Sequence, residues 1–123
     1  MGKISLAVST KRLNNIMDNT LYNYYRSSSS YRVRIALNLK EIPYTLIPIS
    51  LLKHEHKNPE YLKINPQGLV PTWVDENITL TQSLAIIEYL DEVYPNPALL
   101  PKDLILKAHA RQFSLIILVK CIL

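Results

Sequence analysis

Residues 20–43 read TLYNYYRSSSSYRVRIALNLKEIP, and this stretch decides the fold because its pattern changes from strand to helix within a few residues. Its aromatic-rich beginning, 21–25, predicts a β-strand. The four serines at 27–30 are favourable N-cap residues and predict that a helix begins there. A proline closes the stretch and ends the helix. The apolar residues of this helix stand at helical spacing: Val33, Ile35, Ala36, Leu37 and Leu39.

The elements predicted after this stretch favour an α/β domain. A second strand at 44–49 contains Pro48, which indicates an edge strand or a strand end. The order strand, helix, strand, helix, strand, strand, helix predicts a mixed sheet with helices on both faces. The remaining elements are a short helix at 59–64, a turn at 65–68, strands at 70–74 and 78–80 joined by a tight turn at 75–77, and a helix at 81–94.

Composition excludes several classes of function. Only two of the 123 residues are glycines, so neither the Walker nor the dinucleotide type of phosphate-binding loop is present. The single cysteine, Cys121, excludes an internal disulfide, a CxxC redox pair and a cysteine-based zinc site, and it favours a reducing compartment, the cytoplasm. His54 and His56 lack further ligands and predict no metal site. No stretch of about 20 apolar residues predicts a membrane span.

The charge and the apolar pattern also divide the chain. Residues 1–20 hold three basic residues and one acidic residue, and residues 101–123 hold four basic residues and one acidic residue. The part between them holds seven basic and eight acidic residues. The basic excess therefore lies at the ends and predicts no nucleic-acid surface. We expect a non-homologous, disordered lead at 1–19, one domain at 20–100, and a helical remnant at 101–123. The apolar run at the end of that remnant has no obvious cover, which predicts a truncated second domain.

Three blocks of sequence follow one another at characteristic spacing: Arg26–Leu37, Asn65–Thr72 and Gln82–Leu90. Together they resemble the zeta class of glutathione transferases, the maleylacetoacetate isomerases, and the resemblance extends over about residues 20–113. The first block is similar to that family's Ser-Ser-Cys-x-Trp-x-x-Arg-Ile-Ala-Leu signature. It departs from the signature at Ser29, which replaces the cysteine, and at Tyr31, which replaces the tryptophan.

The resemblance implies a thioredoxin-like βαβαββα domain with a four-stranded mixed sheet, followed by the start of an all-helical domain. It implies that glutathione is the cofactor and that a small electrophile, maleylacetoacetate, is isomerised to fumarylacetoacetate in the breakdown of phenylalanine and tyrosine. Members of the family form homodimers. By position, the resemblance makes Ser27 and Ser28 catalytic, and it assigns cofactor binding to Ser29, Arg32, His56, Val70, Pro71, Gln82 and Ser83, with a cis bond before Pro71.

Local chemistry offers a reason for these positions. A free thiol has a pKa of about 8.5, and both a helix N-terminus and a hydroxyl donor favour its anion. Taken alone, however, the serine run is explained as caps and turn formers. Gln82-Ser83 likewise suits either a carboxylate ligand or a simple helix start. Arg32 and Arg34 oppose the dipole of their helix, which a bound anion or exposure to solvent would offset.

Two other functions stay open on the sequence. One is a glutathione-binding fragment with little or no catalysis, because the electrophile pocket of this fold lies between two domains. The other is a non-enzymatic interaction module of the transferase fold, like those attached to translation factors. Such modules often lose the hydroxyl that activates the thiol. The presence of Ser27 and Ser28 therefore argues against the interaction module. The missing cysteines exclude thioredoxin or glutaredoxin activity.

Overall fold

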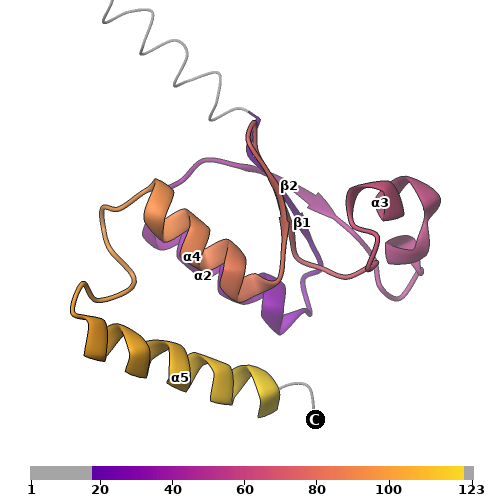
Figure 1. The fold of residues 1–123 in the computed structure, drawn as a ribbon. Coiled ribbons are helices and arrows are strands. Elements are labelled where there is room, and N and C mark those ends of the chain that lie inside the picture. Colours follow the sequence, from indigo (N-terminus) through magenta and orange to yellow (C-terminus); the bar gives the residue numbers. More distant parts are fainter. Residues whose placement is uncertain (1–17, 121–123) are drawn as a thin grey trace, which may run out of the picture.

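The computed structural model describes residues 18–120, without the side chains of the last two. Nearly all of the predicted lead, and Cys121, therefore lie outside the described residues. The elements are β1 (Thr20–Asn23), α2 (Ser28–Leu39), β2 (Thr45–Pro48), a 3₁₀ turn (Glu55–Lys57), α3 (Pro59–Ile64), β3 (Thr72–Val74), β4 (Thr79–Thr81), α4 (Ser83–Val93) and α5 (Leu104–Lys120). Figure 1 shows them in sequence colours.

The four strands form one mixed sheet in the order β2-β1-β3-β4. β1 pairs in parallel with β2 and antiparallel with β3, and β3 pairs antiparallel with β4. The predicted α/β fold is confirmed, and β2 is an edge strand, as Pro48 indicated. The strand predicted at 70–74 begins at Thr72, because Val70 and Pro71 still belong to the turn that precedes it. The peptide bond between them is cis.

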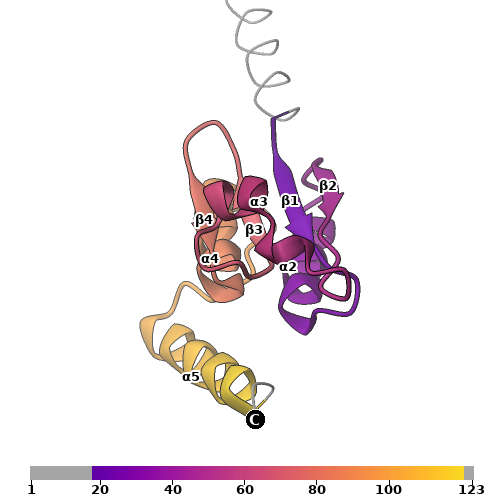
Figure 2. The same ribbon diagram turned by 90° about the vertical axis from the view of Figure 1, so that its right-hand side faces the viewer.

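Helices cover both faces of this sheet. Leu21 pairs with Trp73 in the β1–β3 register and both are buried on the face that α2 and α4 cover. The neighbouring pair, Tyr22 and Thr72, points to the other face because side chains alternate along a strand. There α3 places the Tyr61 ring with its centroid 5.6 Å from that of Tyr22. Figures 1 and 2 show α3 on the opposite side of the sheet from α2 and α4.

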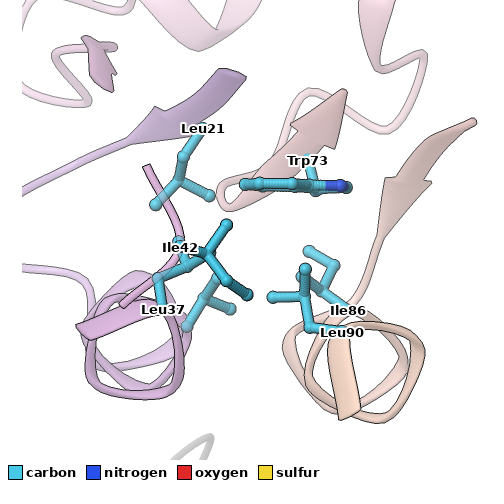
Figure 3. Close-up of a cluster of buried hydrophobic side chains, with 7 residues drawn as sticks. Leu21, Leu37, Ile42, Trp73, Ile86 and Leu90 are labelled. Atoms are coloured by element: carbon cyan, nitrogen blue, oxygen red, sulfur yellow. The ribbon is translucent and has the colours of Figure 1, made fainter. Parts of the chain in front are cut away.

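The core fills the space between the sheet and the pair α2 and α4. Figure 3 shows Leu21 and Trp73 pointing from the strands toward Leu37 of α2 and Leu90 of α4. Trp73 has no exposed surface, which confirms it as a core residue. The two apolar pairs predicted for α2 separate: Val33 and Leu37 are buried, whereas Ile35 and Leu39 are 42% and 58% exposed. The full buried cluster is Leu21, Val33, Leu37, Ile42, Trp73, Ile86 and Leu90.

Asp75 joins the β3–β4 hairpin to α4. Its carboxylate accepts hydrogen bonds from Trp73 Nε1 at 3.0 Å and from the Tyr89 hydroxyl at 2.8 Å. It also accepts the backbone N–H groups of Asn77 and Ile78, which fixes the predicted tight turn. Partial burial raises the pKa of Asp75, but these hydrogen bonds outweigh it and hold the pKa below its usual range. Burial and the bond to Asp75 raise the pKa of Tyr89 to about 12.

A buried ion pair joins the end of α2 to the end of α4. The Lys40 side chain has no exposed surface, and its Nζ lies 2.8 Å from Asp91 Oδ1. The same Nζ donates to the carbonyls of Tyr94 and Pro97, and Asp91 accepts the backbone N–H groups of Leu99 and Leu100. This network therefore also fixes the segment that leads from α4 toward α5.

The last helix, α5, lies beside α2 and α4 and away from the sheet (Figures 1 and 2). A bidentate pair holds it to α4: Arg111 Nε lies 2.7 Å from Glu88 Oε1, and Arg111 Nη2 lies 3.2 Å from Oε2. Much of its apolar surface is exposed, including Phe113 and Ile116. Within residues 18–120, no helix combines the length and the apolar character that crossing a lipid bilayer requires.

Asp91→Asn should lower the free energy of unfolding at pH 7 by about 3 kcal/mol, because it leaves the buried Lys40 charge without a counter-charge. Partial burial raises the pKa of Asp91, but the bonds from Lys40 and the two backbone groups hold it below its usual range. The wild type therefore keeps this contribution above the ordinary carboxyl pKa and loses it as the pH falls through the lowered value. Urea unfolding as a function of pH measures both effects. Glu60→Gln removes the exposed pair with Lys63 and should change little; an equal loss in the two variants would contradict the assignment.

Candidate functional site

A cavity of about 500 Å³ lies where the beginnings of α2 and α4 meet the 65–71 turn and α5. The sheet topology explains this meeting. β4 runs in the same direction as β1, because each is antiparallel to β3. α2 and α4 therefore both begin at the same edge of the sheet. The cavity is lined by Ser29, Arg32, Asn65, Gln67, Leu69, Val70, Pro71, Thr81, Gln82, Ser83, Leu84, Leu115 and Leu118.

The start of α2 is capped by serine, as predicted. Ser27 is the N-cap residue, and its Oγ accepts a hydrogen bond from the Ser30 N–H at 3.1 Å. This bond uses the oxygen as an acceptor and leaves the hydroxyl hydrogen free to be donated. No acidic residue lies in the first turn of α2, so its positive end is not neutralised there.

Arg32 stands on the wall of the cavity and is only partly satisfied. Its Nη2 donates to Ser29 Oγ at 2.8 Å. Its Nε is buried and has no hydrogen-bond partner among the described residues. The Arg32 guanidinium forms no ion pair within residues 18–120 and lies beside a helix N-terminus, so this end of the cavity is electropositive and suits an anionic group.

The turn at 65–71 is fixed by buried polar side chains. Asn65 Oδ1 accepts the Gln67 N–H at 3.0 Å, and Asn65 Nδ2 donates to the carbonyl of Leu69 at 2.9 Å. The Tyr61 hydroxyl donates to the same carbonyl and lies 2.9 Å from Thr72 Oγ1. Burial raises the pKa of Tyr61, so this hydroxyl stays protonated as a donor.

Gly68 is required within this turn for two reasons. Its φ of +63° is a conformation that residues with a side chain rarely adopt, and a Cβ there would lie 2.9 Å from the His56 carbonyl oxygen. Val70, two residues after Gly68, lines the cavity. Its backbone N–H and C=O form no hydrogen bond within residues 18–120. A free N–H and C=O beside a cavity can pair with an extended peptide.

The start of α4 holds a strained residue. Gln82, the N-cap of α4, has φ 69° and ψ 115° and is not a glycine. Such a conformation costs on the order of 1–3 kcal/mol and persists where the surroundings impose it, often at a functional site. Here it lies where the chain enters α4, and Gln82, Ser83 and Leu84 all line the cavity.

The structure brings together six of the nine residues that the sequence assigned to a site. Ser29, Arg32, Val70, Pro71, Gln82 and Ser83 all line the cavity, and the Val70–Pro71 bond is cis as the resemblance implied. Ser27, Ser28 and His56 lie outside its lining. Ser27 caps the adjoining helix, Ser28 is exposed, and the His56 carbonyl packs against the 65–71 turn.

Several lining residues were not predicted to contribute to a site. Asn65 and Gln67 were identified only as turn residues, although a buried side-chain amide beside a turn is a signal for a fixed loop. Leu115 and Leu118 belong to the apolar run whose cover was unknown. They lie four and seven residues after Arg111, so they share its face of α5. The pair Arg111–Glu88 therefore directs them toward the cavity.

The comparisons with known proteins agree with this geometry. Residues 21–98 match the family model of the glutathione S-transferase N-terminal domain. The chain is 56% identical over 94 residues to maleylacetoacetate isomerase of Pseudomonas aeruginosa, an alignment that covers 74% of this chain and 44% of that protein. It is 54% identical over 84 residues to glutathione S-transferase Z1 of Arabidopsis thaliana, an alignment that covers 68% of this chain and 38% of that protein.

Solved structures show the same likeness. A holo structure of maleyl pyruvate isomerase, a bacterial glutathione S-transferase of the zeta class, has a TM-score of 0.73 at 47% identity, covering 76% of this chain and 44% of that one. Human glutathione transferase theta-2, solved with glutathione and an unknown ligand, has a TM-score of 0.75 at 34% identity. The match covers 78% of this chain and 40% of that one. The resemblance to the zeta class is confirmed. The chain spans less than half the length of each of these relatives.

Gln82→Gly should raise the free energy of unfolding by about 1 kcal/mol. Glycine adopts the positive φ without strain, and this gain exceeds the opposing cost of the extra backbone entropy that glycine loses on folding. Gln67→Gly is the matched control in the same cavity. Gln67 has no positive φ, so glycine there should lower the stability. Chemical denaturation of both variants measures the difference, and a loss of stability in both would show that Gln82 is unstrained.

Tyr61→Phe should lower the free energy of unfolding by about 1–2 kcal/mol, because the Leu69 carbonyl and the Thr72 hydroxyl lose a buried partner. The amide NMR signal of Val70 should shift, since the turn that carries it is no longer held by α3. Tyr31→Phe removes an exposed hydroxyl and should change neither quantity. If the two variants behaved alike, the Tyr61 hydroxyl would not fix the turn.

Proposed function

Because the chain belongs to the family of glutathione S-transferase N-terminal domains, we propose that it binds glutathione in the cavity between α2, α4 and the 65–71 turn. The observation that carries this proposal is the convergence, at one cavity, of two helix N-termini with the Val70 backbone, which has no hydrogen-bond partner among the described residues. Glutathione has an anionic γ-glutamyl end, a peptide backbone and a thiol. Each of these chemical groups has a complementary group on the wall or beside it.

The start of α4 is the site for the γ-glutamyl end. Ser83 and the N–H groups of the first turn suit its carboxylate, and the Gln82 side chain lies beside them. Val70 pairs its backbone N–H and C=O with the backbone of the cysteinyl residue, as an added strand would. The remaining carboxylate, at the glycyl end, is the group that His56 would contact by its position in the family.

The start of α2 is the site for the thiol. The helix N-terminus stabilises negative charge, and the Ser27 hydroxyl has a hydrogen to donate toward the sulfur. Ser28 is exposed at the first position of the helix and assists from there. Arg32, bonded to Ser29, adds positive charge close by. Together these groups lower the pKa of the bound thiol and raise the fraction of thiolate at neutral pH.

We further propose that the full activity is that of a glutathione-dependent cis–trans isomerase of the maleylacetoacetate type, in the breakdown of tyrosine and phenylalanine. Glutathione, when bound, would supply the thiolate nucleophile that reversible cis–trans isomerisation of a double bond requires. The chain contributes an apolar wall for the electrophile through Leu84, Leu115 and Leu118. The anionic electrophile and the thiolate share the positive field of Arg32. A cytoplasmic homodimer is the expected setting.

A second candidate function is glutathione binding with little turnover. It is favoured by the exposure of the α5 wall of the cavity: Leu115, which lines it, is 51% exposed, so the electrophile side is open to solvent. Water in that space weakens both the positioning of the electrophile and the electrostatic stabilisation of its charge.

Calorimetric titration with glutathione, followed by the ultraviolet absorbance of the thiolate as a function of pH, tests the proposal. The wild type should bind glutathione and lower the pKa of its thiol below the free value of about 8.5. Ser27→Ala should retain binding while raising the pKa of the bound thiol by about one unit, because one hydrogen bond to the anion is lost. It should also slow the isomerisation of maleylacetoacetate.

Ser30→Ala is the matched control for this experiment. The Ser30 hydroxyl is fully buried and has no partner within the described residues, and the variant keeps the N–H that Ser27 accepts. It should leave the thiol pKa unchanged. Binding without isomerisation would support the second candidate, and failure to bind glutathione would contradict both.

A further inference from the structure

A side pocket of about 120 Å³ adjoins the cavity proposed for glutathione and lies between α2, α4 and α5. The two spaces share four lining residues: Arg32, Ser83, Leu84 and Leu118. The rest of the side pocket is lined by Ile87, Ser114 and Ile117. The Ser114 hydroxyl already donates to the carbonyl of Ala110 at 2.9 Å, within α5. The side pocket is therefore mostly apolar, and Arg32 is the charged residue of its lining.

The terminal nitrogens of Arg32 are the atoms that a ligand at this border can reach. Its Nε is buried and is closed to a ligand. Its Nη2 donates to Ser29 Oγ at 2.8 Å, and Ser29 lines the glutathione cavity, so the end of the guanidinium lies at that wall. Its Nη1 forms no hydrogen bond within residues 18–120 and, unlike Nε, is not buried. Charged N–H donors of this kind bind carboxylates.

Ser29 is the residue that holds the Arg32 guanidinium in this place. The two residues lie three positions apart on α2, so their side chains are neighbours on its surface. An arginine side chain has many rotamers, and fixing it costs entropy when a ligand binds. The bond to Ser29 fixes the guanidinium beforehand. The family signature has a cysteine at this position, and a thiol sulfur accepts hydrogen bonds more weakly than a hydroxyl oxygen.

We propose that Arg32 binds the carboxylate of the electrophile at this border, and that Ser29 is a positioning residue for Arg32. The short apolar chain of the same molecule enters the side pocket between Leu84 and Ile117. The substrate class is thus an electrophile that carries a carboxylate and a short apolar chain. This rests on the proposed function, since it concerns the second substrate of the same site. It differs from the assignment by resemblance, which gives both residues to glutathione.

Titration of hexanoate and of hexanamide into the 123-residue chain, followed by amide NMR, tests the proposal without any variant. The two probes share one apolar chain, and the amide replaces the carboxylate by a neutral group of similar shape. Hexanoate should bind saturably in the millimolar range, about tenfold more tightly than hexanamide. Saturating glutathione should leave the affinity for hexanoate unchanged, because the two ligands use different groups.

Equal affinities for the two probes, or no saturable binding of hexanoate, would overturn the proposal. Competition between glutathione and hexanoate would also overturn it, because Arg32 would then belong to the glutathione site. Failure of the proposed function gives a different result: glutathione does not bind in the calorimetric titration, while hexanoate still does.

Ser29→Ala should weaken hexanoate binding about fivefold and leave hexanamide binding unchanged, because the guanidinium keeps its charge but loses its fixed place. Ser29→Thr keeps the hydroxyl and should restore the wild-type affinity, and Ser29→Cys should lie between the two. An equal effect of Ser29→Ala on both probes would show a merely structural role and would overturn the positioning role.

Arg32→Gln should lower the affinity for hexanoate to that for hexanamide. Arg34→Gln is the matched control, since it removes the same charge two positions along α2 from a side chain that lines neither space. It should keep the wild-type preference for hexanoate, and thermal melting confirms that each variant is folded. Equal losses in the two variants would reduce the effect to general charge and would overturn the proposal.

Discussion

The packing of α2 and α4 side by side against Trp73 is the constraint on which the rest of the structure depends. Trp73 and Leu21 form an apolar surface on one face of the sheet, and the buried side chains of both helices close over it. Because the two helices follow strands of the same direction, this packing also brings their N-termini together. The same apolar contact that stabilises the domain thus collects the positive ends of two helices at one cavity.

Polar contacts fix the packed helices α2 and α4 at both of their ends. At the end away from the cavity, the buried pair of Lys40 and Asp91 fixes the helix C-termini and the segment that follows. At the cavity end, the amide of Asn65 and the hydroxyl of Tyr61 hold the turn that presents Val70. Rigid support on both sides allows a conformation like that of Gln82 to persist, because relaxation of its backbone would disturb α4.

The sequence was sufficient to predict the order of the elements, the mixed sheet and six of the thirteen residues that line the cavity. Turn and cap residues have local causes, so the serine run that begins α2 and the turn at 65–68 were identified correctly. Helical spacing could not decide which apolar pair of α2 faces the core, because Val33–Leu37 and Ile35–Leu39 both have it. The contribution of Leu115 and Leu118 depends on how α5 docks, through a contact between residues 23 positions apart, which no local pattern records.

The two arginines of α2 show why a charge pattern alone is ambiguous. Arg32 is the fifth and Arg34 the seventh of the twelve residues of α2, and neither has an acidic residue beside it in the sequence. In the structure, two residues of separation turn them to opposite sides of α2, since each residue rotates by about 100°. Arg32 faces the junction with α4, and Arg34 faces the edge strand β2. A single anion bound at the junction with α4 therefore cannot contact both side chains. The Arg34 guanidinium instead lies over the Tyr31 ring, 5.3 Å from its centroid, and this contact is favourable without any bound ligand.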